Sequence, residues 1–248
     1  MKKHLILILV TFAFSCNFKS QNIPRIIKAQ KNISICDTLD YDVFNFFNED
    51  KITRFQKEID RFKIQDSLNP PKENSILFVG SSSIRKWKTL ESDFHSIPVI
   101  NRGFGGSTFP ELIYYSEELI FKYKPRTVLI YEGDNDQYFL NPSDILKNAC
   151  YLEKIIHKRL PKTKVFFISV KPSPARRNKN NGMILTNSFL KNYAEHNKKT
   201  YYIDVWNPMF NKNGKINGDI FSHDSLHLNN EGYKIWTKII KTAIMDNN

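Results

Sequence analysis

The sequence predicts a three-layer α/β domain built around a parallel sheet. Short apolar runs alternate with longer segments of helical periodicity over most of the 248 residues. Runs that are apolar on both faces are typical of buried parallel strands, and their alternation with helices favours a sheet covered on both sides. A chain of this length is long enough to bury the core of one such domain. Five runs meet this description, at residues 76–79, 98–100, 127–131, 165–170 and 200–203.

Helical patterns fill the gaps between the predicted strands. Phe55, Ile59 and Phe62 follow i, i+4, i+7 spacing before the first strand. Residues 108–123 predict one helix that ends before Pro125, because the residue that precedes a proline disfavours helical geometry. Three more helices are expected: one marked by Leu146, Ala149, Leu152 and Ile156, with Ser143 as N-cap and Pro161 as stop; one over residues 183–198; and one marked by Tyr233, Trp236, Ile240 and Ala243.

The first residues predict an export signal that is not part of the fold. Two lysines precede an apolar run over residues 5–14, which has the length of a signal-peptide core and is too short to span a bilayer as an uncleaved anchor. Cys16 resembles the lipid-acceptor cysteine of bacterial lipoproteins, although the residues before it match the usual motif only in part. We therefore predict a signal over 1–16, a polar tether over 17–38 and a folded domain over 39–248. Lipid anchoring of Cys16 to a membrane and plain secretion or periplasmic release stay equally open.

The chain is basic, with a formal net charge of +12. Such a charge suits acidic polysaccharides, anionic lipids or nucleic acid. The lysines are spread along the chain beside asparagine and isoleucine, so a compositional bias explains the charge better than a nucleic-acid surface does. No nucleic-acid motif is present, and no nucleic-acid partner is expected.

The three cysteines do not make a disulfide framework. Cys150 lies in an apolar helical stripe, where a small buried hydrophobe is the simplest interpretation. A bridge between Cys36 and Cys150 after export stays open.

Two polar motifs, one near each end of the predicted domain, supply a nucleophile and a base. Ser82 follows the first predicted strand, and Asp224 and His227 lie three residues apart before the last predicted helix. A serine hydroxyl is a poor nucleophile until an imidazole accepts its proton, and an acid on the other ring nitrogen fixes the tautomer. Taken singly, Ser82 is as consistent with a turn or N-cap residue, and His227 with a surface histidine.

Two further segments supply hydrogen-bond donors for an oxyanion. Gly106 follows the second predicted strand and Asn135 follows the third, so both lie at the sheet edge where Ser82 also emerges. A backbone N–H of Gly106, the side-chain amide of Asn135 and the N–H of Ser82 are the candidate donors. Alone, each segment is equally consistent with a plain turn or cap.

Several other site types are disfavoured. The chain has no G-x-S-x-G segment, which disfavours the α/β-hydrolase version of the triad. Its glycine-rich turn at residues 103–106 is not a dinucleotide-binding fingerprint, and no His/Cys cluster has metal-ligand spacing. We therefore expect neither a cofactor nor a metal.

In order along the chain, the four segments resemble those of the SGNH hydrolases, also called the GDSL lipase/acylhydrolase family. The likeness runs from about Ile76 to Trp236. It implies a three-layer flavodoxin-like fold with a five-stranded parallel sheet, and metal-free ester hydrolysis through an acyl-serine. It places Ser82 as nucleophile, His227 as base, Asp224 as its orienter, and Ser82, Gly106 and Asn135 as oxyanion donors. Ser81 departs from the aspartate in the family name, which leaves any structural role of that aspartate in doubt.

A segment after the fourth predicted strand, Lys171 to Arg176, also resembles a recurring segment of this family. Because it emerges at the same sheet edge, Lys171 and Arg176 are expected at the substrate rim. A purely structural loop is the alternative interpretation.

The sequence thus predicts an exported serine esterase that removes a short acyl group, such as acetyl, from a small molecule or a glycan. One alternative is a lysophospholipase or thioesterase that acts on longer acyl chains. The other is a glycan-binding surface module without catalysis, against which the intact set of candidate residues argues.

Overall fold

The computed structural model describes Cys36 and residues 52–247. Contacts divide the chain into the units Met1–Asp37 and Thr38–Asn248, and every element below belongs to the second. The predicted signal over 1–16 lies outside the described residues, and so does the tether over 17–38 apart from Cys36. Cys150 is buried as predicted, and both Cys36 and Cys150 are disulfide-bonded.

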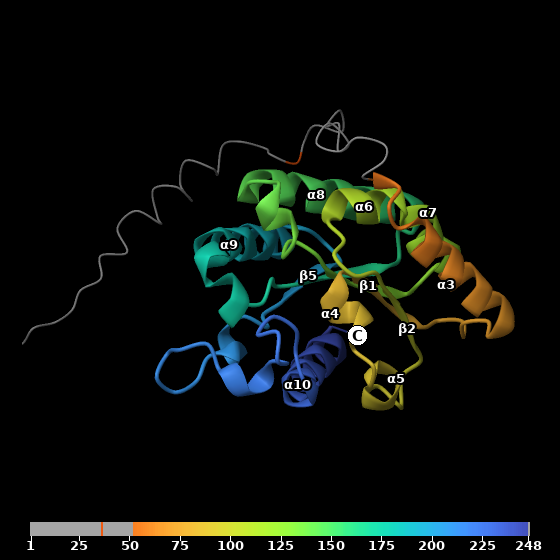
Figure 1. Ribbon diagram of the computed structural model, residues 1–248. Coiled ribbons are helices and arrows are strands. Elements are labelled where there is room, and N and C mark those ends of the chain that lie inside the picture. Colours follow the sequence, from red (N-terminus) through yellow and green to blue (C-terminus); the bar gives the residue numbers. More distant parts are fainter. Residues whose placement is uncertain (1–35, 37–51, 248) are drawn as a thin grey trace, which may run out of the picture. The chain divides into compact units, whose positions relative to one another are not determined.

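Five parallel strands form one sheet in the order β2-β1-β3-β4-β5 (Figure 1), which confirms the predicted fold class. The chain enters the sheet at β1, moves to the edge strand β2 and then crosses to β3. Ligand sites of such sheets lie at the carboxyl ends of the strands where the order reverses, here β1 and β3. The strands are β1 Ile76–Gly80, β2 Val99–Gly103, β3 Thr127–Tyr131, β4 Lys164–Ile168 and β5 Thr200–Ile203.

Helices cover both faces of the sheet (Figure 1), as buried apolar strands require. One face carries α6, α8 and α9, and the other carries α5 and α10. The helices are α3 Gln56–Leu68, α4 Ser82–Arg85, α5 Leu90–Asp93, α6 Phe109–Tyr114, α7 Ser116–Leu119, α8 Pro142–Arg159, α9 Asn180–His196 and α10 Asn230–Asp246. Short 3-10 helices are η1 Phe121–Tyr123, η2 Asp136–Tyr138, η3 Pro174–Lys179, η4 Asn207–Met209 and η5 Gly218–Ile220.

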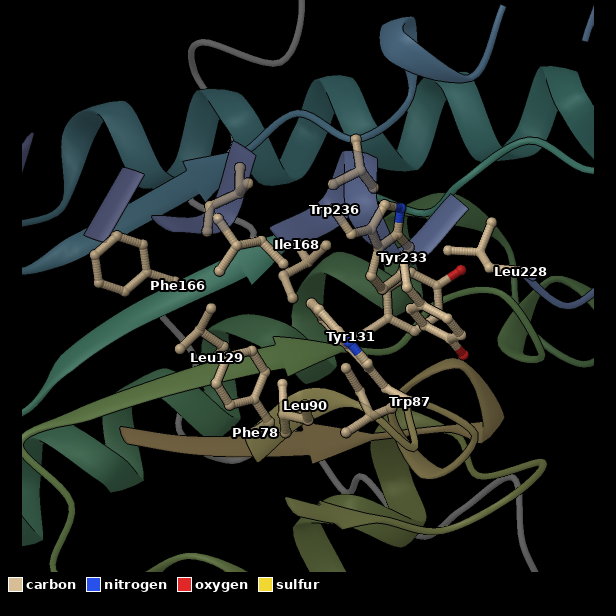
Figure 2. Close-up of a cluster of buried hydrophobic side chains, with 14 of the residues drawn as sticks. Phe78, Trp87, Leu90, Leu129, Tyr131, Phe166, Ile168, Leu228, Tyr233 and Trp236 are labelled. Atoms are coloured by element: carbon tan, nitrogen blue, oxygen red, sulfur yellow. The ribbon is translucent and has the colours of Figure 1, made fainter. Parts of the chain in front are cut away.

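An aromatic cluster between the sheet and α10 connects the segment after β1 to the start of α10 (Figure 2). Trp87, just after α4, stacks on Tyr233 of α10 with 5.1 Å between ring centroids. The Tyr233 hydroxyl donates to the Ser83 carbonyl at 2.8 Å. Trp236 is fully buried against Trp87. Because α4 begins at Ser82 and α10 begins soon after His227, this packing sets the distance between those two residues.

The predicted helix over 108–123 is wrong as a single element. The segment forms α6, α7 and η1, with interruptions at Tyr115 and Ile120. Tyr115 is buried, its ring packs against Phe104 and its hydroxyl donates to the Thr53 carbonyl at 3.0 Å. Tertiary contacts therefore override the local periodicity here.

The N-cap predicted for the next helix is also wrong. Asn141 caps α8 by accepting from the Asp144 N–H at 3.0 Å, with Pro142 in the first turn, whereas Ser143 lies inside the helix. None of the helices in residues 52–247 combines the length and apolarity that a membrane span requires.

Candidate active site

The nucleophile turn follows directly from the end of β1. Gly80 has φ of +130°, and a Cβ there would lie 2.1 Å from the Tyr131 carbonyl oxygen, so only glycine lets β1 pass so close to β3. The Ser81 N–H donates to that same oxygen at 3.1 Å. The chain then turns into α4, which begins at Ser82, where N–H groups have no intrahelical acceptor.

His227 reaches Ser82 from the loop before α10. Its Nε2 lies 2.9 Å from Ser82 Oγ, and its Nδ1 lies 2.6 Å from Asp224 Oδ2. The other Asp224 oxygen accepts the backbone N–H groups of Leu226 and His227 at 3.0 and 2.9 Å. The structure therefore brings Ser82 next to the Asp224–His227 pair, although 145 positions separate Ser82 from His227 in the sequence.

The protonation of this pair follows from its contacts. Partial burial raises the pKa of Asp224, but the hydrogen bonds from His227 and the backbone outweigh it and hold that pKa well below its usual range. Burial lowers the pKa of His227, and the positive charge of Lys86 adds to this effect. Lys86 Nζ lies 3.0 Å from His227 Nδ1 and 3.7 Å from Asp224 Oδ2. Since an ammonium cannot accept a hydrogen bond, an Nδ1–H of His227 donates to the Asp224 carboxylate, and Nε2 stays free to accept from Ser82.

Two of the three predicted oxyanion donors, Gly106 and Asn135, lie on the loops that follow β2 and β3, the two strands that flank β1. Gly106 has φ of +88°, and a Cβ there would meet nothing within 4 Å, so the conformation and not crowding favours glycine. The Asn135 amide donates one hydrogen to the Ser107 carbonyl at 2.8 Å. An amide nitrogen carries two hydrogens, so one remains for a ligand.

Two buried acids lie beneath these donors. Asp136 accepts the N–H groups of Phe109 and Gly133, both at 2.9 Å, and so ties the two donor loops together. Burial raises the pKa of Asp136 to about 7. Glu132 accepts from the Ser107 hydroxyl at 2.5 Å, and burial with the neighbouring Asp136 raises its pKa well above the usual range. These hydrogen bonds link the Gly106 loop to the Asn135 loop.

Sequence reasoning missed Arg54, which holds the Gly106 loop from the N-terminal side. Its Nη2 donates to the Gly106 carbonyl at 2.9 Å, and its Nε pairs with Glu111 Oε1 at 2.5 Å. Glu111 in turn accepts from the Thr108 N–H at 2.9 Å as part of a capping box. The Thr108-x-x-Glu111 pattern could have revealed the box, but no local signal points to Arg54.

The two residues expected at the rim lie elsewhere. The Lys171 side chain is 1% exposed and pairs with Asp134 at 3.3 Å, so placing Lys171 at the rim is wrong: the charge is paired below the surface. Arg176 is also largely buried, with its side chain 14% exposed. It contacts Asp134 and Asn135, which places it behind the donor side of the site.

In residues 52–247 no group of three or more His, Cys, Asp or Glu side chains is arranged to hold a metal ion. This end of the sheet carries a serine, an imidazole hydrogen-bonded to it and to a carboxylate, and hydrogen-bond donors on the loops that follow β2 and β3. Such a set can perform acyl transfer through a serine.

Comparison with known families decides the classification. The model of the GDSL-like lipase/acylhydrolase family matches residues 78–235, which is more than half of the chain and spans all four motifs. The chain belongs to the GDSL-like lipase/acylhydrolase family. It is an acylhydrolase of the GDSL, or SGNH, type.

Solved structures share its fold at low sequence identity. A candidate platelet activating factor from Streptococcus pneumoniae aligns with a TM-score of 0.69 and 19% identity over 79% of this chain and 95% of its own. A GDSL-like lipase from Bacteroides thetaiotaomicron gives 0.65 and 23% over 77% and 98%. An acetylxylan esterase from Geobacillus stearothermophilus, solved as a catalytic mutant, gives 0.55 and 16% over 68% and 93%. Comparison with curated proteins gave no match.

Proposed function

We propose that the protein is an exported serine esterase that removes a short acyl group, such as acetyl, from a hydroxyl of a carbohydrate or another small molecule. The observation that carries the proposal is the geometry at His227. Its Nε2 lies 2.9 Å from Ser82 Oγ while its Nδ1 lies 2.6 Å from Asp224. Within an acylhydrolase family, this arrangement makes Ser82 the nucleophile.

The reaction follows from this geometry. Ser82 Oγ attacks the ester carbonyl carbon while its proton passes to His227 Nε2, and Asp224 stabilises the imidazolium that forms. The negative charge on the carbonyl oxygen is met by the N–H groups of Ser82 and Gly106 and by the Asn135 amide. Collapse of this intermediate breaks the bond to the alcohol oxygen, which takes the proton from His227.

The second half returns the enzyme to its starting state. Water attacks the acyl-serine and gives its proton to His227, and the same donors hold the second oxyanion. The carboxylic acid leaves, and Ser82 regains its proton from the imidazolium. The reaction as written needs no cofactor, because both half-reactions transfer only an acyl group and protons.

A short acyl group suits the residues around the triad. The side chains that hydrogen-bond to His227 and Asn135 include three charged groups, Asp224, Lys86 and Arg176. A long acyl chain gains its affinity from apolar surface, at about 25 cal/mol per Å² buried. An acetylxylan esterase among the similar structures supports a carbohydrate ester.

An exposed aromatic ring also supports a carbohydrate. Tyr138 is 53% exposed, and the Arg176 guanidinium lies 5.2 Å from its ring centroid. Because Arg176 also contacts Asn135, the ring lies one side chain away from an oxyanion donor. An aromatic face at this position can pack against a sugar ring, whose carbon–hydrogen face is apolar.

The first test compares wild type with Ser82→Ala on p-nitrophenyl acetate. We expect kcat to fall by at least about 10⁴ in the variant, because a triad without its nucleophile retains only oxyanion and binding effects. Labelling of wild type by a fluorophosphonate, absent in the variant, would show that Ser82 is the reacting residue. Equal hydrolysis by both proteins would refute the proposal.

Substrate class and export are tested separately. Rates on p-nitrophenyl esters from acetate to palmitate should peak at acetate, whereas a maximum at long chains would favour a lysophospholipase or thioesterase. Acetylated xylooligosaccharides should lose acetate. Absence of both fluorophosphonate labelling and ester turnover, with retained glycan binding, would favour the binding module. Cell fractionation of wild type and Cys16→Ala would test export and lipid anchoring.

A further inference from the structure

We propose that Arg176 is a positioning residue that sets the orientation of the Asn135 amide, so that the amide nitrogen and not its oxygen faces the oxyanion. The inference rests on the proposed function, because it concerns the donor side of that same site. Sequence alone placed Arg176 at the rim, where it would touch substrate. The contacts place it behind Asn135 instead.

An asparagine side chain can adopt two orientations of nearly equal shape that exchange its oxygen and nitrogen. Only one of them presents a donor to the oxyanion. Arg176 Nη2 donates to Asn135 Oδ1 at 3.0 Å. A guanidinium has donors only, so rotating the amide by 180° would set its NH₂ group against another N–H. The Ser107 carbonyl on the other side accepts from Asn135 Nδ2 at 2.8 Å and selects the same orientation.

Arg176 is itself held in place by Asp134, the residue next to Asn135. Its Nη1 lies 2.5 Å from Asp134 Oδ1 and 3.0 Å from the Asp134 carbonyl oxygen. Burial raises the pKa of Asp134, but the charges of Lys171 and Arg176 outweigh burial and keep that pKa below its usual range. The carboxylate therefore stays ionised as an anchor for the guanidinium. Tyr131 donates to Asp134 Oδ2 at 3.0 Å and fixes the carboxylate from the sheet.

The two contacts of Arg176 require a side chain with two donor groups at a fixed separation, which a guanidinium provides. One terminal nitrogen serves Asp134 while the other serves Asn135, and the planar group holds both at a fixed separation. A lysine could supply the charge but not two rigidly spaced donors. Arg176 also belongs to η3, whose Ala175 N–H donates to the Ser225 carbonyl at 3.0 Å in the His227 loop. The segment thus braces both sides of the site.

A double-mutant cycle separates this role from the others that Arg176 could have. We expect Arg176→Ala to lower kcat on p-nitrophenyl acetate by about 10- to 100-fold with little change in KM, since one oxyanion donor is worth about 10²–10³ in turnover. In the Asn135→Ala background the same change should cost less than about threefold, because no amide is left to orient. Arg176→Lys should resemble Arg176→Ala. Free guanidinium should restore part of the activity of Arg176→Ala and none in the double variant.

Arg177 offers a matched control, because it is an exposed arginine on the same segment. Arg177→Ala should leave kcat and KM unchanged. Equal losses from Arg176→Ala in both backgrounds, a loss confined to KM, or full activity in Arg176→Lys would each overturn the positioning role in favour of substrate contact or bulk charge. If Arg176→Ala does not fold, Arg176→Gln, which keeps one donor, takes its place in the cycle. Failure of the proposed function is seen separately, as wild type that is neither labelled at Ser82 nor active on any ester.

Discussion

The two sides of the active site are built in opposite ways. The base side, Asp224 and His227, comes from one turn in which the acid and the base lie three residues apart and bond each other directly. The donor side, Gly106 and Asn135, is held by groups from distant segments, including Arg54 and Arg176. A local pair can be tuned by an exposed neighbour without disturbing the fold. The donor side has less such freedom, because most of the groups that hold it, namely Glu111, Asp134 and Arg176, are largely buried.

Charge is also distributed differently between the two sides. Asp224 is 31% exposed and ionised, and its bonds with His227 help to keep it so. Glu132 and Asp136, beneath the donor loops, are 1% and 0% exposed, and burial raises the pKa of each. Buried acids that stay protonated can act as neutral spacers with hydrogen-bonding oxygens. The base side therefore depends on an ionised acid, whereas the donor side is held by hydrogen bonds to buried acids whose pKa is raised.

The largest expected effect of a single change on the base side, apart from loss of the nucleophile, is that of Asp224→Asn. An amide can bind the imidazole in the wrong tautomer and cannot stabilise the imidazolium, so kcat on p-nitrophenyl acetate should fall by about 10³–10⁴. The melting temperature should fall only modestly, because the bonds that stabilise the carboxylate are partly screened by solvent at a side chain that is 31% exposed. A loss below tenfold would mean that Asp224 contributes little, and it would contradict the view that the Asp224–His227 pair acts as a unit on the base side.

The next effect concerns stability on the donor side. The pKa of Glu132 is raised on folding, so the stability it contributes is fully present below its unfolded pKa of about 4.5 and is lost as pH rises through the folded value. Glu132→Gln resembles the protonated acid and does not titrate. Melting temperatures measured from pH 4 to pH 9 should therefore fall less steeply in the variant. Asp136, with a folded pKa of about 7, should leave a residual slope near neutral pH in both proteins.

Parallel melting curves for wild type and Glu132→Gln would contradict the assignment of a raised pKa to Glu132. Asp144→Asn is a suitable control, since this acid lies at the start of α8 away from the buried acids of the donor side. That variant should keep the alkaline slope of wild type. A change in the pH slope of the melting temperature that occurs in Glu132→Gln and not in Asp144→Asn would show that the effect belongs to the buried acids of the donor side.

The smallest effect is expected for Lys86→Met. Burial and the Lys86 charge both lower the pKa of His227, so removing the charge should raise that pKa. Because the base acts in its neutral form, the acid limb of kcat/KM should move to higher pH, by less than about one unit for a side chain that is 40% exposed. Activity should drop near pH 6 and stay unchanged near pH 8. Lys88→Met, an exposed lysine two residues further on, should leave the profile in place.

Prediction from sequence succeeded best where the signal is local. The five apolar runs become the five strands because a strand buried on both faces must be apolar throughout. Strand ends shift by up to three residues: β2 continues to Gly103, and β4 ends at Ile168. The helix expected over 108–123 is three elements, since the buried side chain of Tyr115 interrupts its periodicity.

The candidate catalytic residues could also be predicted from the sequence, for a related reason. The turn after Gly80 places Ser82, and the three-residue spacing places Asp224 next to His227. Each of these signals therefore lies within a short stretch of sequence. Lys171 misled because a lysine in a loop is usually solvated, whereas this one is buried beside Asp134. Its partner lies 37 positions away in the chain, and no local sequence pattern predicts such a pair.

The amino-acid sequence by itself determined the parallel sheet, the edge of the sheet at which the candidate site lies, and the candidate nucleophile, acid and base. These depend on strand burial, turn geometry and short spacings, which neighbouring residues dictate. Only the tertiary structure decided which distant side chains hold the two candidate donor loops: Arg54 contacts the Gly106 carbonyl, and Arg176 contacts the Asn135 amide. A long arginine side chain can pair with residues that are distant in the sequence. Those partners, including the buried acids, come together only when the sheet and its helices have packed.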